Sequence, residues 1–464
     1  MPGGPPAPSC AGAGPGLIVA PGMKRGLVIL VLLAALGLFW GAGRLNRPLR
    51  EERARQHLNP SDPVGDAPPL LTFTTVALGG FRGILADLLW LRAARLQEEG
   101  QYFELVQLAT WVTRLEPRFP QAWAFHAWNM AYNISVLFAE PANRWRWVRH
   151  GITLLRDEGL KYNPGEARLY RELGWLFQHK IGAAMDQTHL FYKEAWAREM
   201  AALFDGPAPD YERLRPEVRR RMANEYRLDP DLMRKVEEQF GPLDWRLPQA
   251  HAVYWAWRGR PFAAGFELQA CNRMIYQSLR DAFLQGRLAY DTDEGLLLML
   301  PNLDVLPGLL RTLEEFIAMP AWSAEMRDIR RSILGDAALM YYTLNREEEA
   351  RRYFEEWKAG VPSEETPPDF ESFVFKNYVG EIEGSAPPDY GVLIEQTLYQ
   401  SLYWQALGYA DRAAGYERLA ALCRDRAGSG FPPLDEFRRS VRQRLLGELR
   451  SEQARARIRD EAAW

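Results

Sequence analysis

The stretches LEPRFPQAW, residues 115–123, and YNPGEARLYRELGWLF, residues 162–177, decide the fold class. In each stretch a proline precedes an aromatic residue by six positions, Pro117 before Trp123 and Pro164 before Tyr170. The apolar residues around the second junction then recur at helical spacing, and no segment of the chain alternates with period two for long enough to predict a sheet. The sequence therefore predicts an all-α protein.

This junction resembles the boundary between tetratricopeptide repeats, where a proline closes one repeat and an aromatic residue opens the next as W-x2-L-G-x2-Y. Tyr170, Leu173, Gly174 and Phe177 match that opening closely, and Trp123, His126, Ala127 and Met130 match it loosely. A third match has the spacing of both helices and the closing proline of one repeat: Leu334, Ala337, Ala338, Tyr341, Ala350, Phe354 and Pro362. The resemblance implies an irregular α-solenoid of helical hairpins. The first two openings lie 47 residues apart instead of the usual 34, so their hairpins should have longer helices or loops.

The chain also resembles an uncharacterised family of bacterial membrane-anchored proteins with tetratricopeptide-like helices. The strings that show this are LGGFRGILADLLWLRA, RWRWVRHGITLLRDEGLKYNP, ELGWLFQHKIG and GPLDWRLPQAHAVYWA, within residues 78–258. This second resemblance implies a membrane location and no particular reaction.

The amino-terminal region contains a candidate membrane anchor. Lys24 and Arg25 precede an uncharged run of 18 residues from Gly26 to Gly43, near the lower limit of about 17 to 25 for a spanning helix. We expect a single-pass anchor with the bulk of the chain on the non-cytoplasmic side, although the arginines that follow the run favour the opposite orientation. The alternative is a signal peptide cleaved after Gly43.

Composition changes along the chain predict six parts. They are a Pro/Gly tail at 1–22, the transmembrane anchor at 23–43, a tether at 44–77, hairpins at 78–205, a helical middle region without a clear repeat at 206–324, and C-terminal hairpins with a terminal helix at 325–464. The hairpin region begins with an unusual helix. From Leu78 to Leu91 it is apolar nearly all round, which predicts burial on most sides or contact with the membrane surface. Asp87 within it should need an ion-pair partner from another helix.

Charge and cysteine content exclude several classes of function. The 57 basic and 60 acidic residues leave a net charge of -3, which gives no basic field for nucleic acid. Three widely spaced cysteines, without a CxxC pair, support neither a disulfide framework nor a zinc knuckle. The chain has no glycine-rich phosphate loop and no GxSxG motif.

Two groups of residues are weak candidates for a site. His179, Asp186 and His189 have spacings that share a helix face and could hold a metal, but HExxH is absent and a structural role is the simpler interpretation. Arg144, Trp145, Arg146 and Trp147 alternate cations with aromatics, a pattern that binds partners or packs Arg over indole between helices. We assign the second group to partner binding, and we expect no catalytic residue and no cofactor.

Two functions fit these features. The first is a non-catalytic, membrane-anchored scaffold that binds a protein or peptide at the bacterial cell envelope. The alternative is an (α/α) toroid enzyme acting on envelope or extracellular glycans, which would bring two carboxylates together in a central cleft.

Overall fold

The computed structural model describes residues 81–459 except 292–293, 320–322, 363, 365 and 384–388, together with scattered residues between 30 and 52. Contacts divide the chain into two units, Met1–Ala77 and Leu78–Trp464, and only the second is described below. The predicted tail at 1–22, anchor at 23–43 and tether at 44–77 lie largely outside the described residues. Among the residues that are described, no helix is both long and apolar enough to cross a bilayer.

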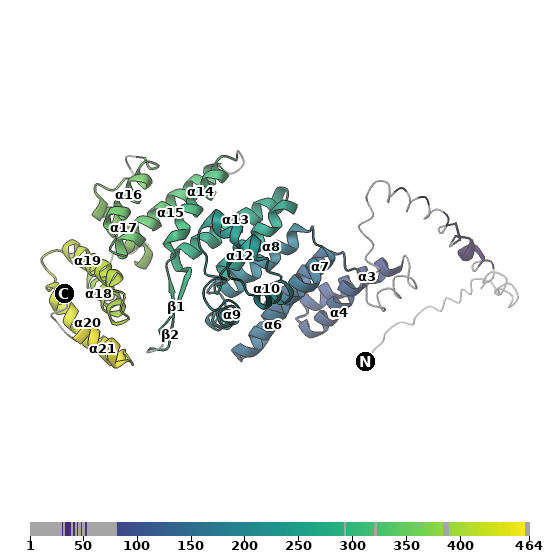
Figure 1. The fold of residues 1–464 in the computed structure, drawn as a ribbon, viewed down its shortest axis with the longest axis horizontal. Helices are drawn as coiled ribbons and strands as arrows, with labels where there is room; N and C mark the ends of the chain where they lie inside the picture. Colours follow the sequence, from purple (N-terminus) through teal and green to yellow (C-terminus); the bar gives the residue numbers. More distant parts are fainter. Residues whose placement is uncertain are drawn as a thin grey trace, which may run out of the picture. The chain divides into compact units, whose positions relative to one another are not determined.

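The second unit is almost entirely helical, which confirms the all-α prediction (Figure 1). Its first part consists of α3 (Phe81–Glu98), α4 (Tyr102–Leu115), α5 (Pro120–Trp128), η1 (Asn129–Ile134), η2 (Ser135–Leu137), α6 (Pro141–Thr153), η3 (Leu154–Gly159), α7 (Leu160–Tyr162), α8 (Ala167–Trp175), η4 (Leu176–Gly182) and α9 (His189–Phe204). Within it η1, η3 and η4 are π-helical continuations of α5, α6 and α8. Consecutive segments pack in pairs, α3 with α4 and α5–η1 with α6.

The rest of the unit continues in the same way. It consists of α10 (Pro216–Arg221), η5 (Met222–Tyr226), α11 (Pro230–Phe240), α12 (Pro248–Gly259), η6 (Arg260–Phe262), α13 (Gly265–Gln285), η7 (Leu303–Val305), α14 (Leu306–Ile317), α15 (Ser323–Thr343), α16 (Glu347–Lys358), α17 (Phe370–Glu383), α18 (Tyr390–Ala406), α19 (Ala410–Ala427), α20 (Leu434–Glu448) and α21 (Glu452–Arg459). The closest pairs are α12 with α13, α15 with α16, and α18 with α19. One hydrophobic core extends from Trp123 to Ile458.

Both proline–aromatic junctions are closed by the same hydrogen bond. The Trp123 indole donates to the carbonyl of Pro117 at 2.8 Å, and the Tyr170 hydroxyl donates to the carbonyl of Pro164 at 2.9 Å. Pro117 lies two residues beyond α4 and Pro164 two residues beyond α7, so each bond joins the first turn of one helix to the loop that precedes it. With six positions between the two residues, an aromatic side chain in the first turn of one helix can reach back to the carbonyl of the proline that follows the previous helix.

The other repeat-signature residues lie mostly in the core. Leu173, Phe177, Ala338, Ala350 and Phe354 are buried. Gly174 lies where α8 approaches α13 closely, since an added Cβ would come within 2.5 Å of the Met274 sulfur. Tyr341 packs on Tyr353 across the α15–α16 pair, with ring centroids 5.2 Å apart. Pro362 instead lies exposed beyond α16.

A two-stranded antiparallel hairpin was not predicted. β1 (Arg287–Asp291) pairs with β2 (Leu296–Leu300), with Arg287 opposite Leu300. The apolar run of β2 has no period that separates a short strand from a helix, which is why the sequence did not reveal it. The turn also has a structural role, because the Glu294 carboxylate accepts hydrogen bonds from the backbone N–H groups of Arg450 and Ser451, just before α21.

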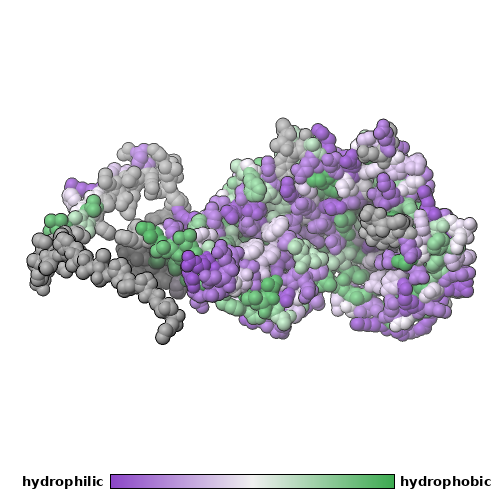
Figure 2. All heavy atoms as spheres, turned by 180° about the vertical axis from the view of Figure 1, so that it is seen from behind, coloured by the Kyte–Doolittle hydropathy of each residue, from purple (hydrophilic) through white to green (hydrophobic). Residues whose placement is uncertain are grey.

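Of the two environments predicted for α3, burial on most sides or contact with the membrane surface, the first is wrong. Ala93 and Leu96 pack against α4, but Ile84, Leu88 and Leu91 are 57%, 60% and 66% exposed. Hydrophobic surface is visible at the end of this unit where α3 lies (Figure 2). Asp87 is exposed as well, so it needs no ion-pair partner.

Candidate functional site

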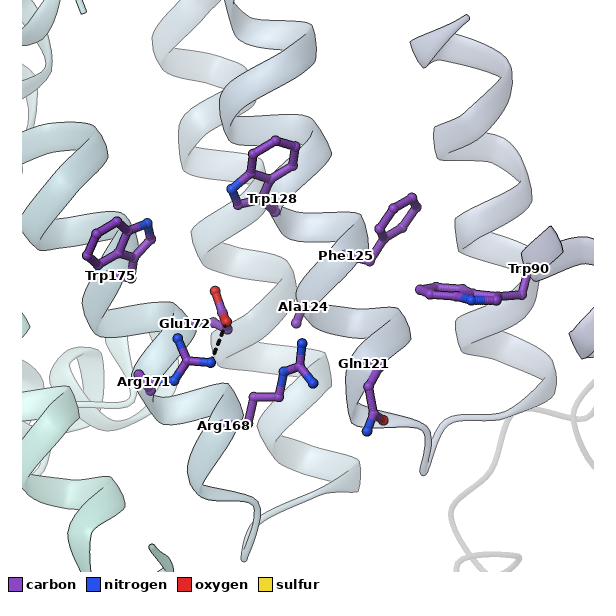
Figure 3. Close-up of a pocket in the computed structure, with 9 residues that line it drawn as sticks. All are labelled: Trp90, Gln121, Ala124, Phe125, Trp128, Arg168, Arg171, Glu172 and Trp175. Carbon is purple, nitrogen blue, oxygen red and sulfur yellow. Dashed lines mark ion pairs between the residues drawn. The ribbon is translucent and has the colours of Figure 1, made fainter. Parts of the chain in front are cut away.

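An open groove of about 510 Å³ crosses helices α3, α5 and α8 (Figure 3). Helix α3 contributes one residue and the other two helices contribute four each. The lining residues are Trp90, Gln121, Ala124, Phe125, Trp128, Arg168, Arg171, Glu172 and Trp175. The groove therefore has apolar aromatic walls and a small number of polar groups, the usual composition of a ligand site.

The residues from α5 and α8 occupy equivalent positions in the two hairpins. Gln121, Ala124, Phe125 and Trp128 precede Arg168, Arg171, Glu172 and Trp175 by 47 residues each, and 47 residues also separate the signature residues Trp123 and Tyr170. One face of each opening helix thus carries the signature residues into the core, while another face lines the groove. The same 47-residue offset therefore relates the groove residues of α5 to those of α8.

Aromatic rings extend the groove wall into the π-helical segments. Trp128 stacks on Tyr132 with centroids 5.3 Å apart, and Trp175 stacks on His179 at 4.5 Å. The Tyr132 hydroxyl lies 3.0 Å from His179 Nδ1 and so joins η1 to η4. These two residues are again 47 positions apart. The wider turns of a π-helix are frequent at functional sites, and here they place the Tyr132–His179 pair beside the two indoles.

The polar groups of the groove are unequally satisfied. Arg171 is paired with Glu172 at 2.9 Å and with Glu267 at 2.6 Å. Arg168 has no ion pair with any residue that the structure describes, and its Nε is buried without a hydrogen-bond acceptor. Since Arg171 is already paired, Arg168 is the groove cation whose guanidinium is left to donate to a carboxylate or carbonyl oxygen.

Burial sets the protonation of the groove's titratable residues. The pKa of His179 is lowered mainly by burial and also by the positive charge of Lys180. The imidazole ring is therefore neutral at pH 7. Burial also raises the pKa of Tyr132, together with the nearby Glu172 carboxylate. The pair is therefore a neutral hydrogen-bonded unit at pH 7 that joins η1 to η4.

The three residues considered for a metal site face different partners. His179 belongs to the groove wall, whereas His189 Nδ1 lies 3.1 Å from Lys193 Nζ. Asp186 accepts a 2.6 Å hydrogen bond from Lys180 and a 3.2 Å bond from Arg144. Within the described part of the chain, no cluster of three or more His, Cys, Asp or Glu residues has the arrangement of a metal site.

The Arg144–Trp147 run does not form one surface. Arg144 also donates to the Phe138 carbonyl at 2.6 Å, and Trp145 is buried against Tyr192 and Trp196. Trp147 packs on Phe103, with centroids 6.2 Å apart, and Arg146 is exposed. Arg144 is bonded within the protein and Trp145 is buried in the core, so only Arg146 and Trp147 of this group are available to a partner.

Sequence reasoning missed the groove residues although the signal was available. The 47-residue offset that separates the repeat openings also pairs Trp128 with Trp175. Comparison of the chain with models of protein families, with curated proteins and with solved structures finds no match. Function must therefore be inferred from the geometry of the groove.

Proposed function

We propose that this chain is a membrane-anchored scaffold of tetratricopeptide-like hairpins that binds an extended segment of a partner protein in the groove across α3, α5 and α8. The observation that carries the proposal is the groove's equivalence in successive hairpins, with aromatic walls beside the unpaired Arg168. Aromatic and arginine side chains are the groups most often responsible for affinity at protein interfaces. Membrane anchoring and the non-cytoplasmic location are parts of the same proposal.

The arrangement of the helices favours an open array over the toroid alternative. Figure 1 draws α3 and α4 at one end of the second unit and α18 to α21 at the other. A toroid requires its first and last helix pairs to meet and to enclose two catalytic carboxylates. The one carboxylate that lines the groove, Glu172, is already paired with Arg171.

The groove chemistry indicates the kind of segment that fits. Indole faces at Trp128 and Trp175 suit an aliphatic or aromatic side chain, and the Arg168 guanidinium suits a carboxylate next to it. We therefore expect an acidic, partly apolar peptide segment.

A photo-crosslinking amino acid tests the groove in intact cells. Placed at Trp128, it should yield discrete adducts that Arg168→Ala removes, because the guanidinium anchors the bound segment. Trp111 on α4 is the matched control, being an exposed tryptophan (52%) outside the groove. Adducts of equal pattern and yield from Trp128 and Trp111, unaffected by Arg168→Ala, would contradict the proposal.

Fractionation tests the anchor and its orientation. The full chain should stay in the membrane pellet after alkaline carbonate extraction, and deletion of residues 23–43 should release it. A C-terminal tag should be digested by protease in spheroplasts if the bulk lies outside the cytoplasm. Extraction of the full chain by carbonate would contradict the anchor, and protection of the tag would contradict the orientation.

A further inference from the structure

The outward face of α3 is an unpartnered apolar surface. Ile84, Leu85, Leu88 and Leu91 are 57%, 39%, 60% and 66% exposed, and their spacing places them on one side of the helix. The opposite side packs on α4 through Ala93 and Leu96. The first element of a helical array normally presents a polar outer face, because no further repeat covers it. This face is therefore a candidate contact surface.

We propose that this face of α3 lies in the interfacial layer of the lipid bilayer, an inference that rests on the proposed membrane anchor. Along the sequence, the predicted tether at 44–77 contains 34 residues, and α3 is the first described helix after it.

The charges along α3 suit a phospholipid surface. Asp87, which is also exposed, is the only acidic residue of the helix before Glu98. Arg92 and Arg95 follow the apolar residues on the exposed side, and Arg92 lies 3.6 Å from Glu104 of α4. Arg95 is the basic residue of the last turn. An interfacial helix buries its apolar face about 5–10 Å deep and keeps cations at the level of the lipid phosphates.

A second copy of the chain is a poorer occupant. A stable protein interface takes about 20–30 residues from each partner, whereas this face offers four large aliphatic side chains. A lipid surface has no such minimum, because each inserted side chain is transferred from water independently.

Contact of α3 with the membrane would also position the groove close to the bilayer surface. Trp90 lies on α3 and packs against Phe125, with ring centroids 4.8 Å apart, so the helix that touches the lipid also forms one groove wall. The bound segment would then be one that runs close to the bilayer surface, such as the membrane-proximal part of another membrane protein.

Site-specific fluorescence on the full-length protein tests the lipid contact. Leu88→Cys is labelled with an environment-sensitive dye in a Cys10→Ser background, and Leu190→Cys on α9, also an exposed leucine (54%), is the matched control. The buried thiols of Cys271 and Cys423 should not react, because burial raises their pKa values to about 11 and about 12. Both proteins are reconstituted into phosphatidylcholine–phosphatidylglycerol vesicles with and without nitroxide-labelled lipid, and circular dichroism checks their folding.

We expect nitroxide lipid to cause a severalfold greater loss of fluorescence at position 88 than at 190, with position 88 protected from aqueous iodide. Equal quenching at the two positions would overturn the inference. Protection of position 88 from both quenchers would also overturn it, since polypeptide and not lipid would then cover α3. Protein that fails to float with the vesicles would remove the anchor as well, whereas floating protein with an unquenched label removes only the α3 contact.

Discussion

Asp186→Ala should lower the free energy of unfolding by about 3 kcal/mol or more, because it leaves the Lys180 ammonium buried without a counter-charge. The two side chains are 7% and 4% exposed, and their charged atoms lie 2.6 Å apart. Removal of one member of a buried ion pair is far more costly than removal of both, since the remaining charge keeps its desolvation penalty. The effect should exceed that of any surface ion pair in the chain.

The surroundings of Asp186 support this expectation. Its carboxylate also accepts hydrogen bonds from the backbone N–H and hydroxyl of Thr188, at 3.0 and 2.7 Å, and from the Tyr192 hydroxyl at 3.0 Å. Burial alone would raise the pKa of Asp186, but the bonds from Lys180 and Thr188 outweigh it and hold the pKa well below its ordinary value. Stability from this carboxylate is therefore fully present above the unfolded pKa of about 4 and is lost as the pH falls toward the folded pKa.

Urea unfolding of three variants separates these contributions. Glu194→Ala breaks the exposed Arg198–Glu194 pair and should cost at most about 0.5 kcal/mol. The double variant Lys180→Met with Asp186→Ala should recover part of the loss, because the buried Lys180 charge is removed together with its partner. If Asp186→Ala costs no more than Glu194→Ala, the buried pair does not exist in solution.

The sequence allowed the fold class and the hairpin junctions to be predicted because these depend on local chemistry. Proline cannot continue a helix, and an aromatic side chain six positions on can donate a hydrogen bond to the proline's own carbonyl. The N-cap of α11 is equally local, because the Asp229 side chain accepts from the Asp231 N–H at 2.9 Å. Such features need only neighbours along the chain.

The candidate site depends on contacts between distant segments and was not predicted. Arg144 and Trp145 are adjacent in a run that suggests a binding surface, but the first bonds to Asp186 and the second enters the core. Arg168 belongs to no sequence motif. That its Nε has no hydrogen-bond acceptor can be seen only in the folded structure, where the surrounding helices are in place. The 47-residue offset can be read from the sequence alone. Once the groove residues of one hairpin are known, the offset identifies the corresponding groove residues of the next.

Gly415→Ala should destabilise the protein by at least about 2 kcal/mol, because α19 crosses α15 at this residue with no room for a side chain. An added Cβ would overlap the backbone carbonyl of Thr343, the last residue of α15, and a backbone cannot rotate away as a flexible side chain can. The clash must also offset a gain of about 1 kcal/mol from replacing glycine with alanine in a helix.

Gly447→Ala in α20 is the matched control for this crossing. An added Cβ there meets nothing within 4 Å, so only the gain in helix propensity remains, and we expect stabilisation by about 0.5–1 kcal/mol. Urea midpoints of the two variants should therefore move in opposite directions. Because Arg418 on α19 also bonds Glu347 on α16, the same crossing fixes the C-terminal hairpins against the third repeat match. A stabilised Gly415→Ala variant would mean that α19 and α15 do not touch there, and the C-terminal hairpins would then have to pack in another way.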